Sequence, residues 1–178
     1  MERHHVLTIA AVAHPDPRVD RLGFELDAPY VERCWVALVG PSATLFLRRL
    51  PSLWSAGEPA RIAESELASS LGLGMGPGSR SRLVRSMDRC ARFGLATWTE
   101  EGTSLAVYRR TPPLRPHQLA RLPEWTQQAH HELLGEHLEA SQRTRPGVES
   151  MTRRLDRLQR PTGTDVVQPI SRTKDVDE

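Results

Sequence analysis

Apolar positions in the middle of the chain recur at helical spacing. Val31, Trp35 and Leu38 follow one another three or four residues apart, and after an interruption at residues 40–42 the apolar residues keep this spacing. Such spacing places apolar side chains on one side of a helix. The pattern therefore predicts a helix, kinked or broken once, over residues 29–53.

The next part of the chain has the pattern of two helices followed by a β-hairpin. Residues 66–71 predict a short helix that ends at a glycine. Residues 80–93 predict a longer helix, with Ser79 as its N-cap and Gly94 after its last turn. Two strand-like segments flank the loop 100–103, in which a glycine permits a positive φ. This loop and its flanks predict a hairpin.

The two ends of the chain are patterned less clearly. Residues 1–28 predict an irregular arm in which residues 6–12 form an edge strand or no fixed structure, because a His-Pro-Asp-Pro sequence soon interrupts them. Helices are expected again within residues 112–143. Their apolar side chains form one stripe, made of Trp125, Ala129, Leu133, Leu134 and Leu138. Residues 144–178 are polar and punctuated by proline and glycine, and we predict that they are disordered.

These segments predict a chain in four parts. An arm over residues 1–28 precedes a domain over residues 29–111, which is followed by the helices of 112–143 and a tail over 144–178. The expected fold class is mostly α with a small β-hairpin. The apolar stripe of the last helix fits two roles, closing the core of the domain or forming a homodimer interface through residues 116–141.

Positive charge is concentrated in one short part of the chain. Residues 80–121 contain 9 arginines and 3 acidic residues, although the formal net charge of the whole chain is only +2. A localised basic segment between two mildly acidic flanks is typical of a surface that binds a polyanion.

The helix predicted over residues 80–93 separates its arginines from its apolar residues. At about 100° per residue, the two sets fall on opposite sides of the helix. The apolar residues are Leu83, Val84, Met87, Cys90 and Ala91. The arginines are Arg82, Arg85, Arg89 and Arg92, with Asp88 beside them. Like charges at this spacing repel each other, which favours a polyanionic partner such as double-stranded DNA.

The order of short helix, connector, basic helix and hairpin resembles the winged helix-turn-helix superfamily. Residues 67–72, Leu-Ala-Ser-Ser-Leu-Gly, are similar to that family's support-helix pattern Leu-Ala-x-x-Leu-Gly, and Phe-Gly-Leu at 93–95 closes the next helix. The resemblance covers about residues 30–110. It implies a winged helix-turn-helix domain with extra N- and C-terminal helices, whose basic helix enters the DNA major groove. The connector at residues 72–78 is longer than the usual turn of three or four residues.

We therefore expect a sequence-specific double-stranded DNA-binding protein, a transcriptional regulator rather than an enzyme. The expected contact residues are Arg80, Arg82, Arg85, Ser86, Arg89, Arg92, Arg109 and Arg110. The first six belong to the basic helix and would contact the major groove and its phosphates, and the last two would lie near the backbone or minor groove. The alternative is a protein-interaction module that docks an acidic protein partner.

Two features that resemble metal or nucleotide sites are incomplete, so no cofactor is expected. His130 and His137 share a helix face, but a His-Glu-x-x-His motif would need histidine where Gly135 stands. We expect these histidines to be solvated. The glycine-rich connector has no lysine and lacks the spacing of a phosphate-binding loop.

Cysteine usage and hydropathy predict a cytoplasmic protein with no membrane association. Cys34 and Cys90 lie among apolar residues of predicted helices, which favours buried free thiols in a reducing compartment. The apolar run at residues 6–13 is too short to span a bilayer.

Overall fold

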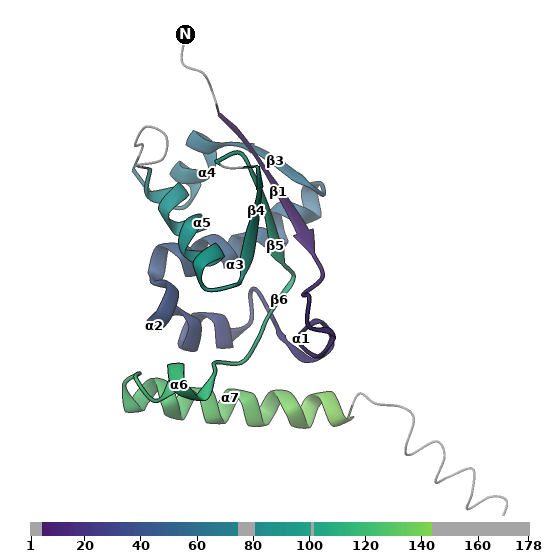
Figure 1. The fold of residues 1–178 in the computed structure, drawn as a ribbon, viewed down its shortest axis with the longest axis vertical. Coiled ribbons are helices and arrows are strands. Elements are labelled where there is room, and N and C mark those ends of the chain that lie inside the picture. Colours follow the sequence, from purple (N-terminus) through teal and green to yellow (C-terminus); the bar gives the residue numbers. More distant parts are fainter. Residues whose placement is uncertain (1–4, 75–80, 101, 144–178) are drawn as a thin grey trace, which may run out of the picture. The chain divides into compact units, whose positions relative to one another are not determined.

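The computed structural model describes residues 5–74, 81–100 and 102–143 of the chain. The larger of its two sheets has four strands, in the order β3-β1-β5-β4 (Figure 1). The strands are β1 (Val6–Val12), β3 (Ala60–Ala63), β4 (Ala96–Glu100) and β5 (Ser104–Tyr108). Strand β1 is parallel to β5 and antiparallel to β3. Strands β4 and β5 form the antiparallel hairpin that the sequence predicts.

The expected fold class, mostly α with a small β-hairpin in a winged helix-turn-helix domain with extra N- and C-terminal helices, is wrong. The hairpin is half of a four-stranded mixed sheet. The difference arises at β1, which was expected to be part of an irregular arm or an edge strand. It instead lies between β3 and β5 and satisfies the backbone groups that face it on both sides. Its residues Leu7 and Ile9 are fully buried.

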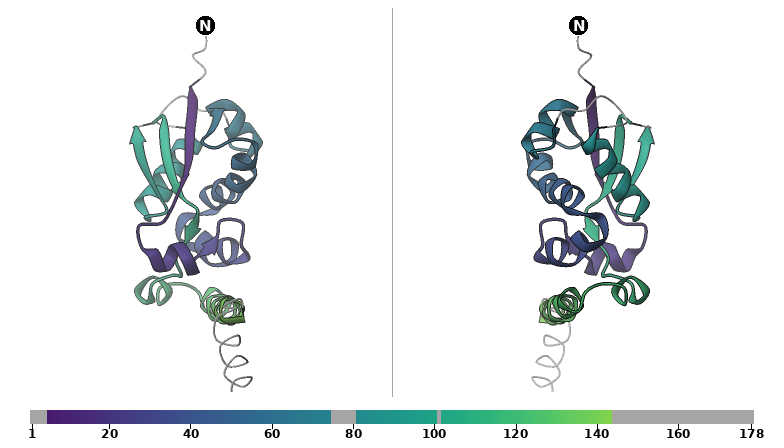
Figure 2. Two further views of the ribbon diagram at one scale, coloured as in Figure 1. Left: turned by 90° about the vertical axis from the view of Figure 1, so that its right-hand side faces the viewer. Right: turned by 90° about the vertical axis from the view of Figure 1, so that its left-hand side faces the viewer.

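Helices cover one side of this sheet, as the side views in Figure 2 show. They are α3 (Pro41–Ala56), α4 (Glu64–Ser70) and α5 (Arg82–Arg92). A π-helical turn η1 (Val31–Trp35) and the short α2 (Val36–Val39) precede them. Gly40, at φ 81°, separates α2 from α3, so the predicted break at residues 40–42 is confirmed.

The core is formed where these helices meet the sheet. Its fully buried side chains include Phe46, Leu47, Leu50, Leu67, Leu83, Met87, Leu105 and Val107. Burying this much apolar surface is the main force that holds α5 against α3 and the hairpin. Both cysteines are buried and free, as predicted.

A smaller two-stranded sheet joins distant parts of the chain. Helix α1 (Pro17–Leu22) leads into β2 (Phe24–Glu25), which pairs antiparallel with β6 (Arg110–Thr111). Gly23 makes the approach possible, because a Cβ there would lie 2.8 Å from the carbonyl oxygen of Thr111. Any side chain at this position would collide with backbone.

The last elements are α6 (Pro116–Leu119) and α7 (Glu124–Arg143). The apolar stripe predicted for α7 does not face inward as a unit, because Trp125 is 73% exposed and Leu138 is 43% exposed. The buried residues of α7 are Thr126, Ala129 and His130. His130 takes an inward position because the Tyr30 hydroxyl is its hydrogen-bond partner. Elements up to Ser141 belong to one compact unit, and the tail predicted over 144–178 lies outside the described residues.

Candidate nucleic-acid interface

Helix α5 is bounded by a cap at each end. The hydroxyl of Ser81 accepts a hydrogen bond from the backbone N–H of Val84 at 3.0 Å, so Ser81 is the N-cap. Ser79, the predicted cap, lies outside the described residues. At the other end, Gly94 has φ 71°, and the N–H of Leu95 donates to the carbonyl of Cys90 at 2.9 Å. The predicted role of Gly94 is confirmed.

The inner side of α5 is sealed into the core. Leu83, Met87 and Cys90 are fully buried, and Val84 is 7% exposed. Burial raises the pKa of the Cys90 thiol to about 12, so the thiol stays protonated. Ser86, expected at the DNA contact, is also buried, and its hydroxyl donates to the carbonyl of Arg82 at 2.8 Å. It therefore does not lie on the outer side.

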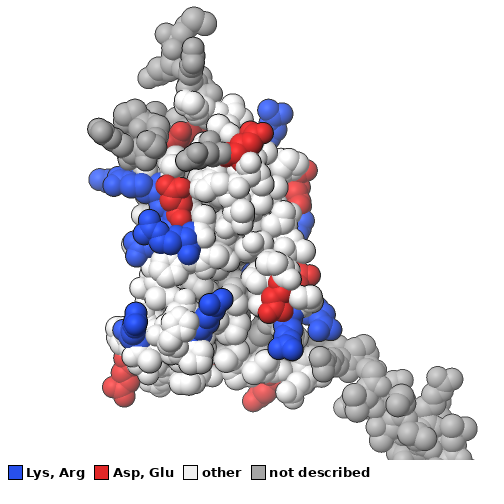
Figure 3. All heavy atoms as spheres, in the orientation of Figure 1, with Lys and Arg blue, Asp and Glu red and all other residues white. Residues whose placement is uncertain are grey.

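The outer side of α5 carries four exposed arginines, Arg82, Arg85, Arg89 and Arg92, which we call the arginine face. The guanidinium groups of Arg82, Arg85 and Arg92 make no hydrogen bond or ion pair with any other residue that the structure describes. Figure 3 shows basic side chains gathered over α5. The sequence-predicted separation of arginine and apolar sides is thus confirmed in the folded helix.

Arg89 differs from the other members of the arginine face. Its Nη2 donates to the carbonyl oxygen of Leu38 at 2.9 Å, at the C-terminal end of α2. The last carbonyls of a helix lack intrahelical partners and carry partial negative charge, so a cation is favourable there. Arg89 therefore links α5 to α2 while remaining exposed.

The acidic residue of α5, Asp88, is held by the hairpin. The indole Nε1 of Trp98, on β4, donates to Asp88 Oδ1 at 2.9 Å. This bond engages the carboxylate that stands beside the arginine face. Sequence reasoning missed Trp98, although its place in the strand after the basic helix was a signal that it could reach α5.

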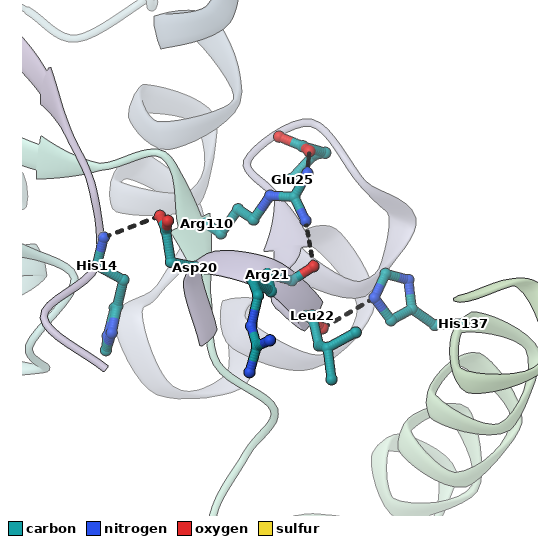
Figure 4. Close-up of polar contacts among 7 residues, drawn as sticks. All are labelled: His14, Asp20, Arg21, Leu22, Glu25, Arg110 and His137. Atoms are coloured by element: carbon teal, nitrogen blue, oxygen red, sulfur yellow. Dashed lines mark hydrogen bonds and ion pairs between the residues drawn. The ribbon is translucent and has the colours of Figure 1, made fainter. Parts of the chain in front are cut away.

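The two arginines that follow the hairpin do not join the arginine face. Arg109 pairs with Glu58 at 2.5 Å. Arg110 pairs with Glu25 at 2.6 Å and also donates to the carbonyl of Arg21 at 2.9 Å (Figure 4). Both positive charges are thus matched within the fold, at the end of β5 remote from the hairpin turn.

One further expected contact, Arg80, lies outside the described residues.

His130 is buried, in contrast to the expectation of solvated histidines on α7, whereas His137 is half-buried and His131 is exposed. The Tyr30 hydroxyl lies 2.6 Å from His130 Nδ1. His137 Nε2 lies 3.0 Å from the carbonyl oxygen of Leu22, a contact that is drawn in Figure 4. Among the residues described, no group of three or more His, Cys, Asp or Glu could hold a metal ion.

Within residues 5–74, 81–100 and 102–143, none of the helices combines the length and apolar character that crossing a membrane requires. Comparison of the chain with protein-family models, with curated proteins and with solved structures gave no match.

Proposed function

We propose that this chain binds double-stranded DNA through the arginine face of α5. The observation that carries the proposal is that Arg82, Arg85 and Arg92 are exposed and unpaired within the described chain, while the opposite side of their helix is buried. Guanidinium groups bind phosphate oxygens and the guanine edge in a bidentate manner, and an α-helix fits the major groove.

Two contacts support a preorganised surface. Arg89 is anchored on Leu38, and the carboxylate of Asp88 is engaged by Trp98, so the helix presents its free arginines with little internal competition. The resemblance of residues 67–72 and 93–95 to winged helix-turn-helix proteins points to the same function. Sequence specificity and a role in transcription are part of this proposal. A homodimer through residues 116–141 and a cytoplasmic location stay predictions.

A titration at two salt concentrations tests the proposal. The variant Arg85→Ala/Arg92→Ala should weaken binding of a labelled duplex, measured by fluorescence anisotropy. The plot of log association constant against log salt concentration should also become less steep by about 2, because each lost phosphate contact reduces the magnitude of its slope by about 1. The matched control is Arg18→Ala/Arg121→Ala, which removes the same charge from exposed positions on α1 and after α6. Equal weakening by the two variants would contradict a specific arginine face.

The pairing of Arg109 and Arg110 favours a second candidate function, the docking of an acidic protein. Because Glu58 and Glu25 match these two charges, the unpaired basic surface that we place at α5 is small and suits a partner with a shorter footprint than a duplex. A pull-down from nuclease-treated lysate distinguishes the two candidates. Capture of one acidic protein by the wild-type chain and not by Arg85→Ala/Arg92→Ala would favour this second function.

A further inference from the structure

Two histidines on one face of helix α7 form hydrogen bonds to the rest of the fold, beside the apolar contacts of Ala129, Leu133 and Leu134, and these two hydrogen bonds have opposite requirements. His130 is 6% exposed and its Nδ1 lies 2.6 Å from the hydroxyl oxygen of Tyr30, which is 1% exposed. His137 lies two turns further along α7, with its ring centroid 4.3 Å from that of Phe24.

The direction of the Tyr30–His130 hydrogen bond follows from a third group. The backbone N–H of Leu114 donates to the Tyr30 oxygen at 2.9 Å, so the hydroxyl proton is free to point at the imidazole. Burial also raises the pKa of Tyr30, so the phenol keeps its proton. Among the described residues, the Tyr30 oxygen has two hydrogen-bond partners, the Leu114 N–H and His130 Nδ1. Because the Leu114 N–H can only donate, Nδ1 of His130 is the acceptor for the buried hydroxyl proton, which requires a neutral imidazole.

The surroundings of His130 oppose its protonation. On α7, the ring of His131 lies 5.2 Å from that of His130. On η1, Cys34 stays neutral because burial raises its thiol pKa to about 11, and Arg33 is paired with Glu132 at 3.7 Å. Within the described chain, no carboxylate forms a hydrogen bond or ion pair with the His130 ring. Burial first, and then His131, lower the pKa of His130.

His137 has no such requirement. The acceptor is the carbonyl oxygen of Leu22 at 3.0 Å, so Nε2 of His137 is the donor. An imidazole keeps an N–H at this nitrogen in its protonated form. The hydrogen bond of His137 therefore uses the imidazole as a donor, whereas the hydrogen bond of His130 needs the imidazole as an acceptor.

We propose that Tyr30 and His130 form a pH-sensitive latch, which holds α7 on the core while His130 is neutral and releases α7 when His130 is protonated. A proton on Nδ1 leaves the Tyr30 hydroxyl without its acceptor and places a charge among buried groups. Release uncovers Phe24 and Ala129, which are otherwise buried. The latch is independent of the arginine face and of the function proposed for it.

The sign of the pH dependence follows from linkage. The undocked histidine has its ordinary pKa of about 6.5, and the docked one a lower value. Docking of α7 is therefore most favourable above about pH 6.5. Its equilibrium constant falls by up to about tenfold per pH unit as the pH falls toward the pKa of the docked histidine.

Hydrogen exchange of the full chain between pH 7.5 and 5.5 tests the latch. After correction for intrinsic exchange, protection of residues 124–143 should fall by up to about tenfold per pH unit below 6.5, while α5 serves as an internal reference. The variant His130→Asn keeps an acceptor near the position of Nδ1 but cannot titrate, so its α7 protection should not depend on pH. The matched control His137→Gln keeps a donor for Leu22 and should retain the pH dependence.

Two results would overturn the latch. The first is α7 protection that is independent of pH in the wild-type chain, or that falls equally in His130→Asn. The second needs no variant: an NMR titration that gives His130 a pKa at or above about 6.5 would exclude a bond that requires neutral imidazole.

Discussion

The indole of Trp98 and the carboxylate of Asp88 join the hairpin to the basic helix, with 2.9 Å between Nε1 and Oδ1. Asp88 stands three residues after Arg85 and four before Arg92. Oppositely charged side chains at these spacings on a helix are neighbours and attract each other. The Trp98 bond therefore keeps a carboxylate from neutralising two members of the arginine face.

We expect Trp98→Phe to weaken DNA binding by about two- to fivefold at low salt, because the released Asp88 carboxylate competes with phosphate for the arginines. Anisotropy titrations would measure this. Adding Asp88→Asn to the variant should restore the affinity, since no carboxylate remains to compete. If Trp98→Phe binds as the wild type does while folding normally, Trp98 has no positioning role.

Arg89 and Arg85 should differ in their effect on stability although both are exposed. Arg89→Ala removes the hydrogen bond to the carbonyl of Leu38 and should lower the free energy of unfolding by about 0.5 kcal/mol. Arg85→Ala removes no side-chain hydrogen bond or ion pair among the described residues, so it should leave that free energy unchanged or raise it slightly by relieving repulsion. Urea unfolding of both variants tests the difference, and equal midpoints would contradict it.

The inner position of β1 predicts a large cost for truncating a side chain near the N-terminus. Ile9 is fully buried between β3 and β5, so Ile9→Ala should lower the free energy of unfolding by about 2–5 kcal/mol. Val6, at the start of the same strand, is 46% exposed, and Val6→Ala should change the free energy of unfolding by less than about 0.5 kcal/mol. Chemical denaturation would compare them, and a mild effect of Ile9→Ala would indicate a dispensable arm.

Two glycine-to-alanine substitutions should change the free energy of unfolding in opposite directions. At Gly23 a new Cβ would lie 2.5 Å from the carbonyl oxygen of Val19, and this backbone collision should cost about 1–3 kcal/mol of unfolding free energy. At Gly135, within α7, a new Cβ meets nothing within 4 Å, so alanine should stabilise the helix by about 0.5–1 kcal/mol. Thermal unfolding of each variant measures the sign, and a stabilising Gly23→Ala would contradict the described packing.

Local patterns in the sequence predicted α5 and its surroundings well. The alternation of arginines with Leu83 and Met87 has the helical period, and Gly94 has the conformational freedom that the helix end requires. Periodicity of this kind depends only on residues a few positions apart. The same reasoning failed for β1, because an inner strand is decided by its partners, and the residues paired with Leu7 and Ile9 lie about 55 and 95 positions further along the chain.

The side-chain partners of the candidate site were also beyond local patterns. Arg110 and Arg82 look alike in the sequence, yet Arg110 is paired with Glu25 and Arg82 is unpaired in the described chain. The sequence predicted a solvated His130, whereas in the fold the hydroxyl of Tyr30 lies beside its ring. Such pairings depend on which distant segments meet.

By itself, the sequence determined which helix segregates charge from apolar surface, because that segregation is a property of neighbouring residues along 3.6-residue turns. Only the tertiary structure decided which arginines remain unpaired, where β1 lies and how α7 is held. The physical reason is that hydrogen bonds, ion pairs and strand pairing act over a few ångströms in space, between groups that the chain separates by many residues.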